Sequence, residues 1–472
     1  MNDSAAARFT AHIARALREA TLTVLAMIAA ALGAAWLDPG PASPVMGAVL
    51  ALSLARSHLS AERHGWLEAL VTLPLVSLAT LGIGLLLHHV PWLGAAVFVA
   101  VVAAASWVRR FGLLAQRLGR LVTLPMVTVL VVPPLPHGSR WGASTVVALL
   151  MPMAVAVLAL VAVLAVQWAG HRLGWLPPRA HARAAPPAPA AGALRPSAPV
   201  RLALQMAVAL GVAFAVGLLA FPAHWRWLVL TAFLVNSGSL GGFDVARKSV
   251  LRVLGAAAGT VLAMGVAGHA LASGATVGAL ILACMYVGLV LRVFGYGWWV
   301  LCVTLALALL QTLEPAAAPL LLWQRVGEIV IGAAIGVAAA AFVFPIPSLD
   351  ILRARLGRAL AAMSEALDPA VDAAARLPEN VSGPMALVKQ MRPVFRAHRL
   401  VRRADAGGPA EWIESLVACE APVIALVQRG ETPGAVRKAV GAARKTLREP
   451  AELGAALAAL RASLEAVKPS SA

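Results

Sequence analysis

Long apolar stretches separated by short polar links fill the first three quarters of the chain. A membrane-spanning helix needs about 20 mostly apolar residues. The pattern therefore predicts an all-α, polytopic membrane protein with about twelve transmembrane helices. The predicted spans are 20–37, 42–56, 67–88, 92–108, 118–134, 142–168, 200–220, 225–240, 247–271, 274–291, 296–313 and 324–346. The second and eighth spans are short, which predicts helices that are broken or tilted.

The pattern changes after residue 346. Residues 347–472 show helical periodicity with charged faces, which predicts a tail of amphipathic helices. One predicted helix carries a row of bases, namely Arg392, Arg396, Arg399 and Arg403. Three interpretations remain open for this row: a solvated or salt-bridged face with Glu411 and Glu414, contact with anionic headgroups, or binding of a regulatory anion.

Composition supports a membrane protein. Hydrophobic residues make up 60% of the 472 positions and charged residues only 13%, which is too little charge for an ordinary soluble chain. The formal net charge is +18. Such basicity can indicate nucleic-acid binding, but in a membrane protein it favours retention of bases on the cytoplasmic side. We therefore expect no nucleic-acid partner.

The basic residues recur in alternate links between the predicted spans. They are Arg8, Arg15, Arg18, Arg56, Arg63, Arg109, Arg110, Arg117, Arg120, Arg172, Arg179, Arg183, Arg195, Arg247, Lys248, Arg252, Arg292, Arg353 and Arg355. The other links hold almost no bases, with Arg140, Arg226 and Arg325 as exceptions. The positive-inside rule then places both termini and the tail in the cytoplasm.

An internal duplication is visible when the sequence is shifted by 183 residues. The shift aligns Arg-Arg-Phe-Gly at 109–112 with Arg-Val-Phe-Gly at 292–295, and Arg18 with Arg201. Six spans per half in one orientation predict two parallel repeats. The predicted organisation is a first repeat at 1–169, a Pro/Ala-rich cytoplasmic linker at 170–198, a second repeat at 199–346 and a cytosolic helical tail at 347–472.

The stretch GGFDVARKSVLRVLGAAAGT at 241–260 holds the main candidate site. Lys248, Arg252, Gly255 and Gly259 are spaced to share one face of a helix. In one interpretation, Asp244 is the N-cap, the bases anchor to headgroups and the glycines allow a close helix contact. In the other, the face lines a route for an anion at a helix N-terminus. The sequence leaves both open.

A family resemblance rests on HWRWLVLTAFLVNSGSLGGFDVARKSVLRVLGAAAGT, residues 224–260. This stretch has a Trp-rich entry, small polar residues from Asn236 and Ser237 onward, a basic helix start at Arg247 and Lys248, and then Arg-x-x-Gly-x-x-x-Gly. It resembles the signature of the fusaric acid resistance (FUSC-like) family, which includes aromatic acid exporters. Ala256 departs from the Gly-Thr that often occurs in the family. The resemblance is clear over about 200–346 and fainter over 18–168.

Charges inside predicted spans are further candidates, because they are costly in lipid and usually functional. Glu328 follows Arg325 by three residues, and two interpretations remain open, a local ion pair or a role in proton coupling or gating. Asp244 is the second proton-coupling candidate. Arg109 and Arg292 either anchor to lipid or bind the anion. Tryptophans near span ends, such as Trp92, Trp225 and Trp227, are interpreted as an interfacial belt.

The resemblance implies an exporter of small organic anions, aromatic carboxylic acids foremost, in a bacterial inner membrane. Proton coupling is expected, since no nucleotide-binding loop occurs in the sequence. A passive organic-anion channel and a membrane scaffold without transport remain alternatives. We expect no catalytic constellation, cofactor or metal site. The bilayer and the anion are the expected partners, and a periplasmic adaptor and a homo-oligomer are compatible with the resemblance.

Overall fold

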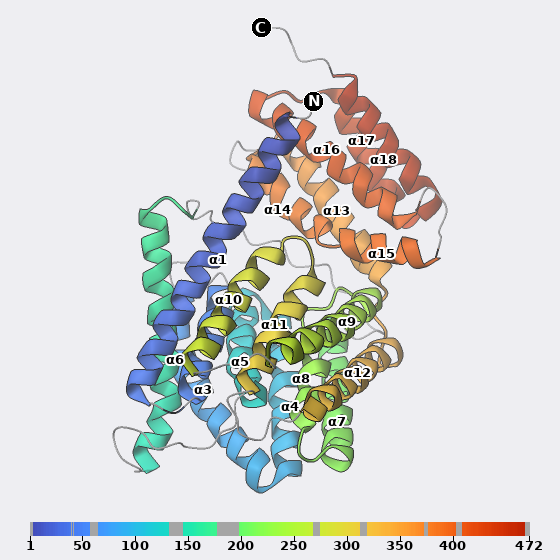
Figure 1. Cartoon of the computed structure of the whole chain (residues 1–472). Helices are drawn as coiled ribbons and strands as arrows, with labels where there is room; N and C mark the ends of the chain where they lie inside the picture. Colours follow the sequence, from blue (N-terminus) through green and yellow to red (C-terminus); the bar gives the residue numbers. More distant parts are fainter. Residues whose placement is uncertain are drawn as a thin grey trace. The chain divides into compact units, whose positions relative to one another are not determined.

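The structure is a computed structural model that describes residues 3–38, 40, 42–56, 65–131, 145–176, 198–267, 274–311, 319–371, 376–402 and 408–467. Within these ranges all the regular elements are helices (Figure 1). Most of the predicted linker at 170–198, and Arg403 of the basic row, lie outside the described residues.

Each predicted apolar span overlaps one helix, although α1 begins well before the predicted start at 20. The helices are α1 (Asp3–Leu37), α2 (Ala42–Ala55), α3 (Gly65–His89), α4 (Pro91–Val108), α5 (Leu113–Val131), α6 (Thr145–Arg172), α7 (Ala198–Ala220), α8 (Trp225–Asn236), α9 (Gly242–Ala267), α10 (Gly274–Leu291), α11 (Tyr296–Gln311) and α12 (Pro319–Phe342). The short 3-10 helix η2 (Arg109–Phe111) joins α4 to α5. This agreement follows from the length and apolarity of the segments.

Eight of these helices are long and apolar enough to cross a membrane, within the part of the chain that the structure describes. They are α1, α3, α4, α5, α6, α7, α9 and α12, and α2, α10 and α11 are shorter apolar helices. The 12 residues of α8 rise only about 18 Å, less than the hydrocarbon thickness. The chain is therefore a multi-pass membrane protein, while the count of twelve spans stays a prediction.

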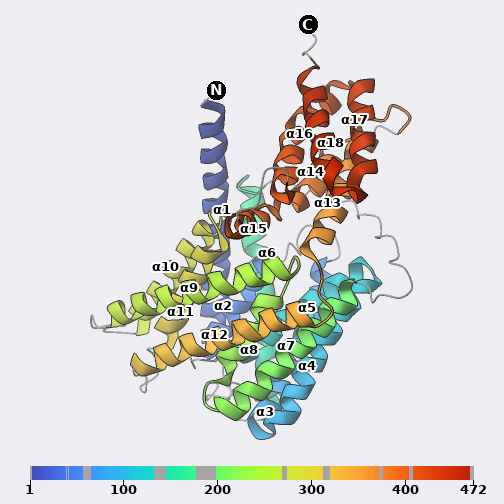
Figure 2. The same ribbon diagram turned by 90° about the vertical axis from the view of Figure 1, so that its right-hand side faces the viewer.

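The described residues form two compact units. The apolar unit comprises described residues of 1–181, 186–237 and 248–344, and the tail unit comprises 238–247 with described residues of 345–472. Inside the apolar unit, α1 packs against α2, α6 and α10, whereas α7 packs against α8, α12 and α4. Figure 2 shows α7, α8 and α12 side by side. Under the 183-residue shift, the neighbours of α7 correspond to the neighbours of α1.

The tail unit has a hydrophobic core of its own. It contains α13 (Ser348–Ala366), α14 (Pro378–Lys389), α15 (Arg392–Arg402), α16 (Pro409–Arg429), α17 (Gly434–Lys445), the 3-10 helix η3 (Thr446–Arg448) and α18 (Pro450–Glu465), orange to red in Figure 1. Apolar residues at helical spacing, such as Leu356, Met385 and Ile413, are fully buried between these helices. Their burial stabilises the predicted amphipathic helices.

The first turn of α9 belongs to the tail unit. Gly241 precedes it with φ +99°, and an added Cβ there would lie 2.9 Å from Cα of Ser348, so glycine suits the conformation and the space. The helix begins at Gly242, two residues before Asp244. The prediction of Asp244 as N-cap is therefore wrong: its carboxylate lies in the first turn and accepts a hydrogen bond from the Leu240 N–H at 3.0 Å.

Candidate functional site

Arg252 is the buried base of the predicted motif. It lies on α9 with 5% of its surface exposed. Its Nε donates a hydrogen bond to Oγ1 of Thr231 on α8 at 3.3 Å, and it also interacts with the hydroxyl of Tyr296 at the start of α11. The guanidinium is thus held by side chains from two other helices.

A second buried arginine lies on α12. The Arg325 guanidinium stacks over the ring of Trp227 on α8, 3.8 Å from the ring centroid. This is a close cation–π contact, which is favourable for a base removed from water. Arg325 also interacts electrostatically with Arg252 and with Glu328. Two positive side chains from α9 and α12 therefore influence each other inside the apolar unit.

Glu328 is the carboxylate of this group and is only 1% exposed. Its Oε1 lies 3.9 Å from Nδ1 of His224, directly before α8. Its Oε2 is buried without a hydrogen-bond partner among the described residues. The histidine side chain is 38% exposed, so it offers Glu328 a polar neighbour that reaches the surface of the unit.

We name Arg252, Arg325 and Glu328, with Trp227, Thr231 and His224 around them, the buried charge cluster. It contains two arginines and one carboxylate. Buried charge is costly unless it is compensated, and an arginine fork matches a carboxylate in geometry and charge. The cluster therefore carries one more positive group than negative groups. No group of three metal-ligating residues occurs in the described ranges.

The glycines of the motif lie against α11. An added Cβ would lie 2.9 Å from Cγ1 of Val300 at Gly255, and 2.9 Å from the carbonyl oxygen of Leu301 at Gly259. On α12, a Cβ at Gly332 would meet the carbonyl oxygen of Leu228. These contacts are those of the close-packing interpretation, in which glycine lets two helix backbones approach.

The remaining polar residues of the motif surround the end of α8. Lys248 donates from Nζ to the carbonyl oxygen of Ser237 at 3.5 Å, and Asn236 donates from Nδ2 to the carbonyl oxygen of Ala232 at 3.0 Å. Asn236 is buried and faces Gly336 of α12. Arg247 is half-buried and belongs to the tail unit.

The repeated arginines have different surroundings. Arg109 lies in η2, and its side chain packs against Gly119 of α5. Arg292 follows α10, where it interacts electrostatically with Arg56 and Glu19. Arg56 in turn lies 5.0 Å from the ring centroid of Trp299 on α11. Their roles as anchors or as anion-binding residues stay predictions.

Sequence reasoning missed three members of the cluster, namely His224, Trp227 and Thr231. Trp227 was assigned to an interfacial belt, but its ring lies under Arg325. Trp225, assigned to the same belt, is buried against Phe214. The sequence did carry one signal for these partners, namely Arg325. It is a base in a link that the alternating pattern expects to lack bases, so it needs a nearby partner.

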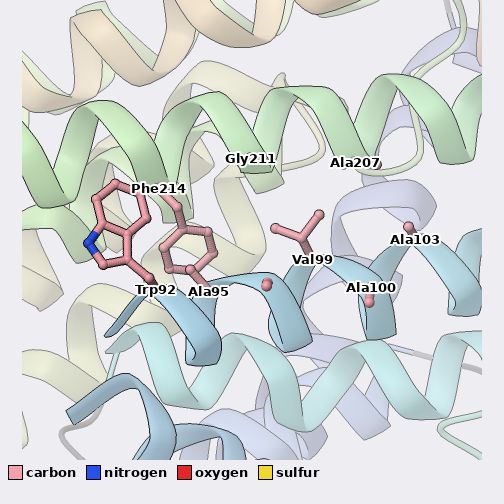
Figure 3. A pocket seen from close by; sticks show the side chains of 9 residues that line it. Trp92, Ala95, Val99, Ala100, Ala103, Ala207, Gly211 and Phe214 are labelled. Atoms are coloured by element: carbon pink, nitrogen blue, oxygen red, sulfur yellow. The ribbon is translucent and has the colours of Figure 1, made fainter. Parts of the chain in front are cut away.

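An apolar groove lies elsewhere in the apolar unit, between α4 and α7. It has a volume of about 440 Å³ and is lined by Trp92, Ala95, Ala96, Val99, Ala100, Ala103, Ala207, Gly211 and Phe214. Figure 3 shows the rings of Trp92 and Phe214 at one end of it. Because its lining carries no charged side chain, it is not the candidate site for an anion.

The apolar helices and the buried charge cluster define the class as a multi-pass membrane protein. Residues 206–339 match the model of a family described as fusaric acid resistance protein-like, which confirms the predicted resemblance over this segment. The segment includes the whole buried charge cluster. No curated protein and no solved structure matches the chain. The apolar helices together with this domain indicate a transporter-type membrane protein.

Proposed function

We propose that the chain exports small organic anions, foremost aromatic carboxylic acids, across a bacterial inner membrane. The observation that carries the proposal is the pair of buried arginines, Arg252 and Arg325, which has only Glu328 as buried carboxylate in the cluster. A carboxylate solute compensates the excess positive charge in surroundings where water cannot do so. The aromatic preference comes from the family resemblance.

The proposed route begins at the cytoplasmic face. Arg247 and Lys248 at the start of α9 attract the anion, with Arg292 and Arg109 as further cytoplasmic bases, and the solute then reaches Arg252 and Arg325. This assignment requires the orientation predicted from the links, with both termini and the tail in the cytoplasm. It also takes the two halves as parallel repeats, which the matching neighbours of α1 and α7 support.

Coupling to the proton gradient is the proposed energy source. Glu328 and Asp244 are the candidate proton carriers, because both are buried acids next to the residues assigned to the route. The contact between Glu328 and the partly exposed His224 favours Glu328 as a group that protons can reach.

A passive organic-anion channel is the second candidate. The net positive charge of the cluster would attract anions into a channel. The inside-negative membrane potential would then drive them outward, with about 2.3 kcal/mol per unit charge and 100 mV. Such a route needs no proton. A membrane scaffold without transport predicts that the cluster can be neutralised without consequence.

The decisive experiment measures retention of labelled 4-hydroxybenzoate, benzoate and fusaric acid in cells that lack or overproduce the protein. Export predicts lower retention in the overproducing cells, and equal retention of the whole panel would overturn the proposal. A proton uncoupler then separates the two transport mechanisms, since passive efflux down the substrate gradient persists when the proton gradient has collapsed.

A further inference from the structure

Three polar residues that α9 buries share one face of this helix. Ser249, Arg252 and Thr260 are all buried, and their spacing places them within roughly 80° of each other around the axis. At 1.5 Å per residue, Thr260 lies about 16 Å further along the helix than Ser249. We call these three residues the α9 polar face.

The two hydroxyls of this face have an unusual environment. A buried Ser or Thr in a helix commonly bonds to a carbonyl three or four residues earlier. In this chain, Thr80 and Ser106 do so with the carbonyl oxygens of Val76 and Val102. Oγ of Ser249 and Oγ1 of Thr260, in contrast, have no hydrogen-bond partner among the described residues. Burial of a hydroxyl without a hydrogen bond is unfavourable, so water or a solute is expected to satisfy both hydroxyls.

The first half of the chain repeats this environment. Ser77 on α3 precedes Thr260 by the 183 residues of the predicted duplication. It is also buried, and its Oγ also has no hydrogen-bond partner in the described part of the chain. Ser77 and Thr260 therefore occupy corresponding positions of the two halves and have the same environment. This recurrence indicates a shared feature of both halves.

The opposite side of α9 is apolar. Val250, Leu254 and Val261 are exposed on the surface of the apolar unit, as expected for side chains that face lipid. The polar face instead continues onto neighbouring helices, because Arg252 bonds to Thr231 of α8. The buried charge cluster adds one more oxygen without a described partner, Oε2 of Glu328.

We propose that the α9 polar face lines a hydrated passage through the apolar unit, in which water and the transported anion contact Ser249, Arg252 and Thr260. The passage lies beside Gly255 and Gly259, which contact α11. The identity of the anion rests on the proposed function. The presence of water along this face does not, because it follows from the two hydroxyls.

Cysteine accessibility tests the passage. In a background with Cys284, Cys302 and Cys419 replaced by Ala, Ser249→Cys and Thr260→Cys are placed on the polar face. Val250→Cys and Val261→Cys are matched controls, one residue away on the exposed apolar face. Membranes holding each full-length variant are treated with the anionic reagent 2-sulfonatoethyl methanethiosulfonate. Only a thiolate reacts, and a thiol ionises far more readily in water than in lipid.

We expect both polar-face cysteines to react at least tenfold faster than their matched controls, and 4-hydroxybenzoate to slow the reaction at Thr260→Cys. Reaction at or below the rate of the matched control, in every polar-face variant that folds, would overturn the passage. Two positions keep the test decisive if one variant fails to fold. Fast reaction in a protein that exports none of the panel would overturn the proposed function and leave the hydrated passage standing.

Discussion

Nε of Arg252 on α9 donates a hydrogen bond to Oγ1 of Thr231 on α8 at 3.3 Å, and both residues are buried. This contact joins the family-like motif on α9 to a helix too short to cross the membrane. It also fixes a guanidinium inside the apolar unit, where a charge is retained only with partners. Removal of either side chain therefore tests whether the charge or only the packing matters.

Arg252→Ala is expected to reduce efflux of labelled 4-hydroxybenzoate from proteoliposomes at least tenfold, because it removes half of the buried positive charge that faces the anion. Arg252→Lys should retain part of the rate, since it keeps the charge but loses the planar fork. Leu254→Ala is the control, two residues away and exposed on the same helix. Normal efflux by a correctly inserted Arg252→Ala protein would remove Arg252 from the route.

Glu328→Gln is expected to abolish the coupling of anion efflux to the proton gradient. The amide keeps the shape but cannot carry a proton, so efflux should become insensitive to an imposed pH gradient while binding of the anion persists. Asp244→Asn is the comparison, because Asp244 instead accepts the Leu240 N–H at the start of α9. The measurement is efflux from proteoliposomes with and without a pH difference. Unchanged pH dependence in Glu328→Gln would exclude this residue as the proton carrier.

Gly259→Ala should destabilise the contact between α9 and α11. The new Cβ would lie 2.9 Å from the carbonyl oxygen of Leu301, and overpacking of this kind costs about 1–3 kcal/mol. Gly265→Ala is a matched change on the same helix, where a Cβ meets nothing within 4 Å. The melting temperature of the purified protein should fall in the first variant only, and an equal response of both would contradict the close contact.

Glu414 should make the tail unit sensitive to acid. Hydrogen bonds from Arg392 first, and also from Arg396, hold the pKa of this carboxyl below its ordinary value. Since the folded pKa is the lower one, the stabilisation is present above the unfolded value of about 4.3 and is lost as the pH falls through the folded pKa. The melting temperatures of wild type and Glu414→Gln should therefore differ at pH 7, and the gap should narrow as the pH falls below about 4.

The difference in melting temperature between wild type and Glu414→Gln is expected to be modest. The Glu414 side chain is 34% exposed, and solvent screens such ion pairs. Glu452→Gln changes an exposed residue of α18; it is the control and should follow wild type throughout. A gap between wild type and Glu414→Gln that stays constant from pH 7 to pH 3 would show that the carboxylate charge is not its cause.

The hydrophobic pattern by itself determined where the helices lie. Twelve apolar stretches became α1–α12, because a long apolar segment can satisfy its backbone in lipid only as a helix. The amphipathic pattern after residue 346 became α13–α18 for a related reason, since each helix buries its apolar side in a shared core. The residues of 224–260 were also sufficient to reveal the family resemblance that the match over 206–339 bears out.

Only the tertiary structure decided which polar residues meet. Arg252 and Thr231 are 21 residues apart, and Arg325 and Trp227 are almost a hundred apart. The face shared by Lys248, Arg252 and the two glycines was readable from spacing, but its neighbours were not. Helical periodicity fixes which side chains share a face, whereas packing of distant helices fixes what that face contacts. For that reason the glycines of α9 proved to touch α11, and the buried hydroxyls beside them became visible only in the folded chain.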